Sequence, residues 1–273
     1  MADGKLAGWR VLITGGGSGI GLACAARFLA DGATVTLMGR DPERLAGAAS
    51  NLRAEPGQVL TVSGDVAVEA DVQQAVAVAT GDTGRLDVAI ANAGMGGLAP
   101  VLHQDIGEFE RLMRTNLNGT LLTYKHAGAA IAASGGGAMC SVSSIAGVRT
   151  HRFMGAYCAS KAAIDMLTRN AADELGIAGV RCNSVCPGLV ETDLSQGLQD
   201  DPDVLKDYMD CMPIRRTGKV EDIAEAVRFL CGPEATWITG VVLSVDGGHH
   251  LRRGPNVEKF AAALYGEDAI IGR

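Results

Sequence analysis

The sequence has neither a long run of basic residues nor a long hydrophobic run. Its 24 Lys and Arg are outnumbered by 31 Asp and Glu, its formal net charge is −7, and its longest basic run is the pair Arg252–Arg253. A chain of this charge is a poor partner for phosphate backbones, so we expect no nucleic-acid partner. The longest charge-free stretch, residues 127–148, carries five Gly and four Ser. Such a segment does not suit a lipid-facing helix, and we expect no membrane association.

Cysteine pairs of the kind that bind metals or form redox motifs are also missing. The seven cysteines are an odd number, widely spaced, with no C-x-x-C pair and no neighbouring His cluster. This pattern predicts buried, reduced thiols and no metal site. The first five residues, Met-Ala-Asp-Gly-Lys, contain no apolar signal region, so we expect a cytoplasmic protein.

What the chain does contain is typical of one folded domain. Hydrophobic residues make up 47% of it and charged residues 20%, which argues against disorder. A length of 273 residues fits a single domain over residues 1–273. The 37 glycines follow no repeat period and form no linker, so we expect them at turns and close approaches.

Short, nearly continuous apolar runs alternate with longer Ala-rich stretches. We predict buried strands at residues 9–14, 33–39, 58–63, 87–91, 137–142, 180–186 and 241–245. We predict helices at residues 19–30, 43–53, 68–80, 109–133, 156–175 and 220–230. This alternation indicates an α/β fold with a Rossmann-like, doubly wound, parallel seven-stranded sheet. Such sheets bind ligands beyond the carboxyl ends of their strands.

A glycine-rich turn follows the first predicted strand. Residues 14–21 have the sequence TGGGSGIG, with Gly15, Gly19 and Gly21 in the spacing G-x-x-x-G-x-G. Glycines let the backbone approach a pyrophosphate, whose charge is stabilised by N–H groups at the helix N-terminus. We therefore place Ser18 and Ile20 with these glycines in a nucleotide site. A glycine-rich loop that binds nothing is the alternative.

The end of the second predicted strand bears on the choice of cofactor. Gly39 stands where a carboxylate would bind a ribose 2′-hydroxyl, and Arg40 follows it. An Arg here suits a 2′-phosphate. Asp41 precedes Pro42 and is expected to cap the next helix. We therefore favour NADP(H) over NAD(H), although Ser18 is not the basic residue that would strengthen this choice.

Tyr157 and Lys161 are four residues apart in an Ala-rich helical pattern, hence on one helix face. A nearby cation lowers the pKa of a tyrosine from its usual value of about 10. The pair therefore predicts that Tyr157 is a general acid and base. A half-buried Tyr beside a surface Lys is the plain alternative.

With these motifs, the sequence resembles the short-chain dehydrogenase/reductase family, in its shorter single-domain branch, similar to 3-oxoacyl-thioester and hydroxysteroid reductases. The matches follow in order over roughly residues 8–248. The matching motifs are residues 14–21, Asp65-Val66, Asn92-Ala93-Gly94, Asn116, residues 143–147, the Y-x-x-x-K of residues 157–161, Pro187-Gly188 with Thr192, residues 213–218 and residues 245–248.

The resemblance implies a catalytic role for four of these residues. Ser144, rather than Ser143, would polarise the substrate carbonyl. Tyr157 would exchange a proton with the substrate oxygen, and Lys161 would lower the Tyr157 pKa and bind the nicotinamide ribose. Asn116 would hold a water that links Lys161 to solvent, with a local helix hydrogen bond as the alternative.

The resemblance also implies contacts to the cofactor. Asp65 would meet the adenine amine and Val66 would line its pocket, with an N-cap for the following helix as the alternative for Asp65. The remaining contacts would come from Asn92, Ala93 and Gly94 beneath the adenosine ribose, from Pro187 and Gly188, and from Val190 and Thr192 at the carboxamide.

Residues 188–213 would form a mobile lid over the substrate. Seven acidic residues lie in this region against one Lys, and we expect them to face solvent. Substrate contacts are expected from residues 94–98, 146–153 and 189–194. Their apolar side chains favour a hydrophobic carbonyl or secondary alcohol: Met95, Val148, Phe153, Met154 and Leu189. His151 and Arg152 are candidates for an anionic or hydroxylated substrate, although we expect this loop to be exposed.

Residues 249–273 extend beyond the end of many relatives. His249, His250, Arg252 and Arg253 are candidates for binding a phosphate-bearing carrier such as coenzyme A, but we favour a flexible basic tail. Family analogy implies a homotetramer that is joined through residues 109–133 and 156–175.

The sequence therefore predicts an NAD(P)(H)-dependent oxidoreductase that interconverts a small-molecule carbonyl and a secondary alcohol, with acyl thioesters and steroid-like molecules among its candidate substrates. One alternative is an epimerase or dehydratase with the same Tyr–Lys pair, but the chain lacks room for a large substrate domain. The other is a non-catalytic NAD(P)-binding sensor, which would have no need of all four catalytic residues.

Overall fold

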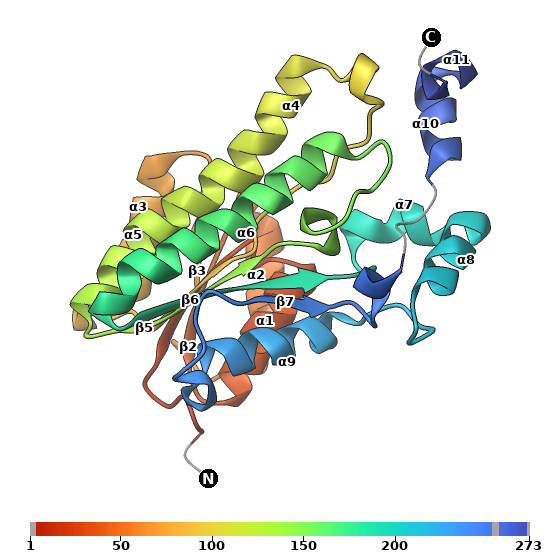
Figure 1. The fold of residues 1–273 in the computed structure, drawn as a ribbon. Helices are drawn as coiled ribbons and strands as arrows, with labels where there is room; N and C mark the ends of the chain where they lie inside the picture. Colours follow the sequence, from red (N-terminus) through yellow and green to blue (C-terminus); the bar gives the residue numbers. More distant parts are fainter. Residues whose placement is uncertain (1–3, 253–256, 272–273) are drawn as a thin grey trace.

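The computed structural model describes residues 4–252 and 257–271. They form a parallel sheet between two layers of helices (Figure 1), with strand order β3-β2-β1-β4-β5-β6-β7. The strands are β1 (Arg10–Thr14), β2 (Thr34–Gly39), β3 (Val59–Ser63), β4 (Val88–Ala91), β5 (Gly137–Val142), β6 (Val180–Pro187) and β7 (Val242–Val245). The predicted seven-stranded, doubly wound sheet is confirmed.

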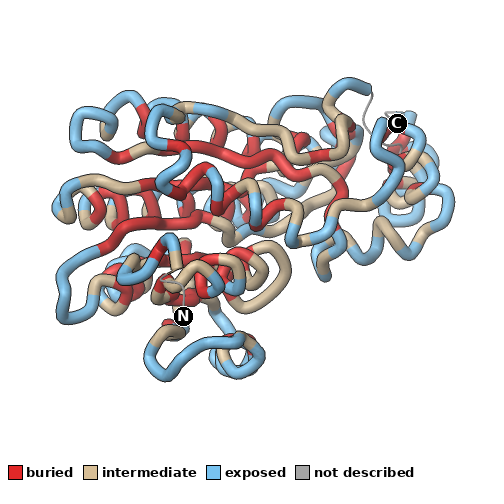
Figure 2. The backbone as a smooth tube through the Cα atoms, turned by 90° about the horizontal axis from the view of Figure 1, so that it is seen from below, coloured by how far each residue is buried: buried red, intermediate tan, exposed pale blue. Residues whose placement is uncertain are grey.

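Helices cover both faces of this sheet. One layer contains α1 (Gly19–Ala30), α2 (Pro42–Asn51) and α9 (Val220–Cys231), and the other contains α3 (Glu69–Thr80), α5 (Gly119–Ala133) and α6 (Gly155–Leu175). Val11 and Ile13 of β1 pack into the first layer's core, whereas Leu12 packs into the second. Because both faces are covered, the strands are apolar at successive positions. Figure 2 shows this burial along the strands.

The order of the strands creates one topological switch point. Strand β1 pairs with β2 on one side and with β4 on the other, so the chain crosses from the β3 edge back to the middle of the sheet. At the carboxyl ends of β1 and β4, the loops that follow these strands therefore diverge. This divergence opens the crevice in which doubly wound sheets bind their ligands.

Residues 109–133 are helical as predicted, but the helix begins earlier, at Ile106, and contains a π-helical turn that was not predicted. The chain forms α4 (Ile106–Met113), then a π-helical turn from Arg114 to Asn118, and then α5. Such turns accommodate an extra residue and are frequent at functional sites. Asn116, within the turn, is fully buried and hydrogen-bonds Met95 and Ser160. These tertiary contacts account for a π turn that the helical pattern does not reveal.

Four helices come from two segments that lie far apart in the sequence, the lid and the C-terminal extension. The lid contains α7 (Gln196–Gln199) and α8 (Pro202–Cys211), and residues 257–271 form α10 (Glu258–Tyr265) and α11 (Glu267–Ile270). Asp201 caps α8 just before Pro202, as Asp41 caps α2 before Pro42. This repeated signal was available in the sequence, but no lid helix was predicted from it.

The described part of the C-terminal extension is packed against the lid and the loop before α6. Lys259 pairs with Asp203 at 3.2 Å, Glu258 pairs with Arg152, and the Tyr265 hydroxyl donates to the Leu98 carbonyl at 2.9 Å. Val257 and Ala261 are buried. The expectation of a flexible basic tail is therefore wrong for residues 257–271, because apolar burial and ion pairs hold them in place.

No helix within residues 4–252 and 257–271 has both the length and the hydropathy needed to cross a bilayer.

Candidate active site

A long cleft lies at the carboxyl ends of the central strands. One part, of about 310 Å³, is lined by the glycine-rich turn, the ends of β5 and β6, α6 and the lid. A second part, of about 660 Å³, is lined by the ends of β2 and β3 and the start of α2. The two parts share five lining residues: Gly15, Ser18, Ala93, Gly94 and Met95. The cleft is therefore continuous. After the groups that the sequence predicts for them, we call the first part the substrate end and the second part the adenosine end.

The glycine-rich turn has the shape that a pyrophosphate site requires. Gly15 and Gly19 have φ values of +65° and +51°. A Cβ on Gly15 would lie 2.8 Å from the Asn92 amide nitrogen, and one on Gly21 would lie 2.3 Å from the Gly15 carbonyl oxygen. The first turn of α1 carries no acidic residue. Its N–H groups thus face the cleft without a competing carboxylate, which fits a dinucleotide cofactor.

Asn92 braces this turn from the end of β4. Its side-chain amide donates to the carbonyls of Thr14 and Gly15, both at 3.0 Å. The Thr14 hydroxyl in return accepts the N–H groups of Asn92 and Ala93 at 3.1 and 3.2 Å. The Asn92 side chain therefore positions the glycine turn, while Ala93 and Gly94 line both ends of the cleft.

At the adenosine end, Arg40 is exposed and lines the cleft. Asp41 accepts the N–H groups of Glu43 and Arg44 at 3.0 and 3.1 Å, so its carboxylate caps α2 as expected. Arg44 lines the same region and pairs with Asp193 of the lid. Sequence reasoning missed Arg44, whose signal is its place in the first helical turn, four residues after Arg40.

Asp65 and Val66 also line the adenosine end. The Asp65 carboxylate accepts the Ala67 N–H at 2.9 Å in a local turn. The suggested N-cap role of Asp65 is wrong, because the residue at that position of α3 is Val68. Val66 is buried against Gly119, where a Cβ would approach it to 2.7 Å.

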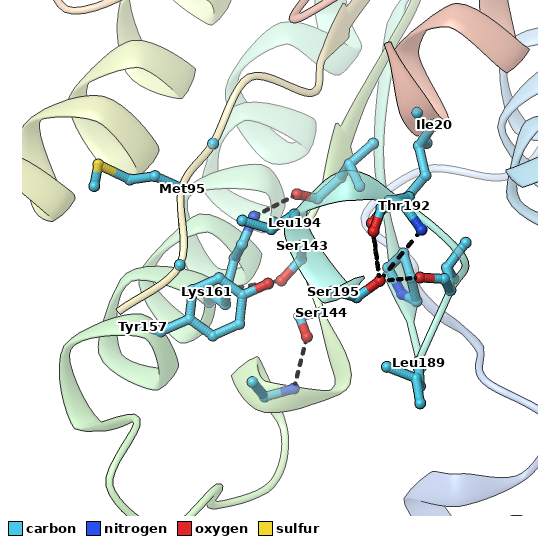
Figure 3. A pocket seen from close by; sticks show the side chains of 18 of the residues that line it. Ile20, Met95, Ser143, Ser144, Tyr157, Lys161, Leu189, Thr192, Leu194 and Ser195 are labelled. Atoms are coloured by element: carbon cyan, nitrogen blue, oxygen red, sulfur yellow. Dashed lines mark hydrogen bonds between the residues drawn. The ribbon is translucent and has the colours of Figure 1, made fainter. Parts of the chain in front are cut away.

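Ser144, Tyr157 and Lys161 all line the substrate end, where Figure 3 shows them close together. Ser144 lies just after β5, and its hydroxyl accepts the Ala146 N–H at 3.1 Å. The Ser143 hydroxyl instead donates to the Lys161 carbonyl at 3.1 Å and is buried. This contact commits Ser143 to supporting α6, which favours Ser144 as the hydroxyl available to a substrate.

Burial governs the ionisation of the Tyr–Lys pair. It raises the pKa of Tyr157, an effect that the nearby Ser144 hydroxyl opposes. It also lowers the pKa of Lys161 to about 8, against the opposing effect of Asp165. The ammonium lies 5.6 Å from the centre of the Tyr157 ring and donates to the Val142 carbonyl at 2.8 Å. The expected lowering of the Tyr157 pKa by Lys161 is therefore wrong for this structure, because desolvation dominates.

Asn116 fastens the loop after β4 to the helix that carries the Tyr–Lys pair. Its amide oxygen accepts the Met95 N–H at 2.8 Å, and its amide nitrogen donates to the Met95 carbonyl at 2.9 Å and to the Ser160 hydroxyl at 3.1 Å. The side chain is thus engaged with protein groups. Its role in a water-mediated proton relay stays a prediction.

The lid begins against the glycine-rich turn. Four residues predicted from the resemblance line the substrate end: Pro187, Gly188, Val190 and Thr192. A Cβ on Gly19 would lie 3.4 Å from the Thr192 methyl group. Thr192 also forms a capping box with Ser195 at the 3₁₀ turn Asp193–Ser195. This turn keeps Val190 and Thr192, the residues expected at the carboxamide, beside the glycine-rich turn, which is expected at the pyrophosphate.

Only some of the side chains expected at the substrate line this cavity. Met95, Met154 and Leu189 line the substrate end. Val148 is 49% exposed and Phe153 packs against the lid core, so neither lines it. Leu194 of the predicted segment 189–194 lines it, and the lid contributes three lining residues that sequence reasoning missed: Ser195, Leu198 and Tyr208. Their signal was weak, because only tertiary packing turns these lid residues toward the cleft.

The loop before α6 and the start of the extension also differ from expectation. His151 is buried and lines the substrate end, whereas Arg152 is exposed and pairs with Glu258. His249 is buried against Tyr208, and His250 pairs with Asp246. These contacts argue against a carrier-phosphate site. Arg252 donates to the Asp210 carbonyl at 2.8 Å, and Arg253 lies outside the described residues.

Within the described ranges 4–252 and 257–271, no group of three or more His, Cys, Asp or Glu side chains has an arrangement that would hold a metal ion.

Known proteins are similar to this chain over most of its length. The sequence model of a family described as "Enoyl-(Acyl carrier protein) reductase" matches residues 15–250. The 2-(R)-hydroxypropyl-CoM dehydrogenase of Xanthobacter autotrophicus is 35% identical over 242 residues, which cover 87% of this chain and 97% of that enzyme.

Two solved structures are also similar. A short-chain type dehydrogenase/reductase from Mycobacterium ulcerans is 39% identical, with a TM-score of 0.95 over 98% of this chain and 99% of that chain. A 7α-hydroxysteroid dehydrogenase solved with NADH and 7-oxo glycochenodeoxycholic acid is 30% identical, with a TM-score of 0.85 over 91% and 97%. The first similarity continues beyond residue 250 into the C-terminal extension.

Proposed function

The chain belongs to the short-chain dehydrogenase/reductase family and is an NAD(P)(H)-dependent oxidoreductase acting on secondary alcohols and ketones; on that premise, we propose that Tyr157 is its general acid and base. When bound, the nicotinamide cofactor supplies or accepts the hydride. The three proteins compared above are dehydrogenases or reductases, which favours this activity over a sensor, an epimerase or a dehydratase.

One observation carries the proposal: Ser144, Tyr157 and Lys161 line a single cavity that continues to the glycine-rich turn. In the reductive direction, Ser144 donates a hydrogen bond to the substrate carbonyl. Tyr157 retains its proton at neutral pH because burial raises its pKa, and it gives that proton to the substrate oxygen. Lys161, with its pKa lowered to about 8, can return a proton toward the phenol. Catalysis by a positioned acid of this kind contributes about 10²- to 10⁴-fold.

The test is the Tyr157→Phe variant. We expect kcat to fall by about 10²- to 10⁴-fold, while cofactor affinity, measured by fluorescence titration, stays nearly unchanged. Tyr265→Phe is the matched control, since its hydroxyl bonds the Leu98 carbonyl away from Tyr157. Retained turnover in Tyr157→Phe would remove Tyr157 from its proposed role.

NADP(H) is the cofactor that we propose. Gly39 leaves no carboxylate at the tip of β2, and the Asp41 carboxylate is engaged in capping α2. Arg40 and Arg44 both line the adenosine end, where a 2′-phosphate would place its charge. For the rest of the cofactor, we propose the contacts that the family resemblance predicts.

The proposal also includes a homotetrameric assembly and a cytoplasmic location. A homotetramer is supported by large apolar side chains exposed on the helices that we expect to join subunits, among them Leu121 on α5 and Met166 on α6. Light scattering on the purified protein tests this assembly, and a monomeric mass would contradict it. No disulfide joins any of the seven cysteines, and six of them are buried, which supports a reducing, cytoplasmic location.

A further inference from the structure

We propose that His151 and Tyr208 together bind a hydroxyl group of the substrate, so that the enzyme prefers an alcohol or ketone carrying a second hydroxyl over one with a single oxygen. This inference rests on the proposed function of the Tyr157 site and names the class of molecule that the site accepts. It concerns two residues that come from separate parts of the chain, the loop before α6 and the lid helix α8.

Both residues line the substrate end of the cleft together with Ser144 and Tyr157. His151 is 6% exposed and Tyr208 is 4% exposed. Three apolar side chains line the same end: Met154, Leu189 and Leu198. A substrate hydroxyl that enters this cavity would find the imidazole of His151 and the phenol of Tyr208 in its wall.

The hydrogen bonding of His151 indicates what it offers to a ligand. Its Nδ1 lies 3.2 Å from the Arg149 carbonyl oxygen, which can only accept, so we assign the proton to Nδ1. In the neutral ring, Nε2 is then an acceptor. Burial, with a smaller contribution from His249, lowers the pKa of His151 and favours this neutral form. His151 therefore suits a group that donates a hydrogen bond.

Tyr208 supplies the complementary donor. Burial raises the pKa of its phenol, with Tyr157 acting in the same direction, so the hydroxyl stays protonated. Its ring packs edge-on against His249 at 5.6 Å, and the His249 ring lies 6.2 Å from the His151 ring. The His249 ring thus packs against both other rings and helps to fix His151 and Tyr208 relative to each other. A hydroxyl, which both donates and accepts, matches the pair.

The same chemistry disfavours a charged substrate group at this position. Neither His151 nor Tyr208 carries a positive charge in the forms assigned above, and among the described residues that line this end Lys161 is the one Lys or Arg. Lys161 is held at the Tyr157 side by the Val142 carbonyl. A carboxylate or phosphate beside His151 would therefore lose its hydration without gaining a cation. The site fits an uncharged diol or hydroxyketone on an apolar carbon frame.

The experiment compares kcat/KM for cyclohexanol with that for each isomer of cyclohexane-1,2-diol, -1,3-diol and -1,4-diol, with NADP⁺ as oxidant. We expect at least one diol to exceed cyclohexanol by 10-fold or more. Tyr208→Phe keeps the ring packing and removes only the hydroxyl, so it should reduce this ratio by about 3- to 10-fold, as for one neutral hydrogen bond. His151→Phe should act in the same direction. Tyr265→Phe, outside the substrate end, should leave the ratio unchanged.

A charged probe and a binding measurement complete the design. Cis-4-hydroxycyclohexanecarboxylate should be a poorer substrate than the best diol, and the opposite order would overturn the inference. Equal rates for cyclohexanol and every diol, or equal loss for both classes in Tyr208→Phe, would overturn it as well.

If the wild-type enzyme oxidised none of the panel, protection of the NADP⁺-loaded protein against thermal unfolding would decide between the two proposals. Protection by a diol but not by cyclohexanol, lost in Tyr208→Phe, would support the hydroxyl site and count against the proposed role of Tyr157. Absence of protection by every diol would overturn the hydroxyl site.

Discussion

The adenosine end and the substrate end of the cleft are built in different ways. At the adenosine end, most of the contributing segments directly follow a strand of the sheet, and some of its shape is held by residues within a few positions, as when Asp41 caps α2. At the substrate end, the loop before α6, the lid and β5 meet from separate parts of the chain. The C-terminal extension then packs against the lid and that loop.

This difference indicates that the substrate end determines which substrate the enzyme accepts. Under the proposed function, a cofactor common to many enzymes would be held by a turn and by strand tips, whose geometry follows from the backbone of the sheet. The substrate is enclosed by segments that the sheet does not constrain. Substitutions at the two ends should therefore produce separable effects, on cofactor binding at one end and on substrate KM at the other.

Among the substitutions that test this difference between the two ends, the most damaging is expected at the glycine-rich turn, because it affects both stability and cofactor binding. A Cβ on Gly21 would lie 2.3 Å from the Gly15 carbonyl oxygen and 2.6 Å from the Asn92 amide nitrogen. Gly21→Ala should lower the free energy of unfolding by about 1–3 kcal/mol, as overpacking does, and weaken cofactor binding more than about 10-fold. Denaturant unfolding and cofactor titration measure both effects.

Gly17→Ala is the matched control within the same turn, because its Cβ would lie at an ordinary 3.5 Å from Leu45. If Gly21→Ala behaved like Gly17→Ala, the close approach of α1 to β1 would not matter for the cofactor.

The next effect should fall on the choice between the two cofactors. Removing the guanidinium in Arg40→Ala should raise KM for NADP(H) by about 10- to 100-fold, since hydrogen bonds to charged groups contribute about 1.5–3 kcal/mol. KM for NAD(H), which lacks the 2′-phosphate, should change less than about 2-fold. Steady-state kinetics with both cofactors provide the measurement. Equal changes for NADP(H) and NAD(H) would refute the 2′-phosphate assignment.

A smaller effect is expected on the pH profile of the reaction. Burial lowers the pKa of Lys161 to about 8, and the Asp165 carboxylate raises it. Asp165→Asn removes that charge, so Lys161 should lose its proton at a lower pH. The decline of the reductive kcat/KM with rising pH should therefore begin at lower pH than in the wild type.

Ser184→Ala is the control for this shift, because it removes the 2.8 Å hydrogen bond to Asp165 and keeps the carboxylate. Coincident profiles for Asp165→Asn and the wild type would show that Lys161 does not govern the alkaline limb.

The smallest effect should come from the C-terminal extension. Lys259 pairs with Asp201 and Asp203 at the start of α8, the helix that carries Tyr208. Such exposed pairs contribute about 0.2–1 kcal/mol, so Lys259→Ala should raise the substrate KM by about 2- to 5-fold without changing cofactor affinity. Lys206→Ala breaks a pair with Asp210 inside α8 and is the control. Similar KM values for the two variants would mean that the extension does not position the lid.

How far the sequence alone could lead is clear from particular residues. Gly15, Gly19 and Ser144 directly follow strands, so a motif placed on the predicted sheet was enough to locate them. The lid helix α8 was missed although Asp201-Pro202 repeats the signal at Asp41-Pro42. The π turn at Asn116 was missed for a different reason, since its cause is a pair of contacts with distant Met95 and Ser160.

The ionisation of the site illustrates the same limit. A four-residue spacing between Tyr157 and Lys161 was enough to place both on one helix face, but it says nothing about burial. The folded chain surrounds both groups, so that desolvation raises the pKa of Tyr157 and lowers that of Lys161.

By itself, the sequence determined the parallel sheet and placed the glycine-rich turn at the carboxyl end of its first strand, because hydrophobic periodicity and glycine spacing act over a few residues. Only the tertiary structure decided that His151 and Tyr208 line one cavity, that Arg44 meets Asp193, and that residues 257–271 close on the lid. These contacts join segments as much as 149 residues apart, and they depend on packing that no local pattern encodes.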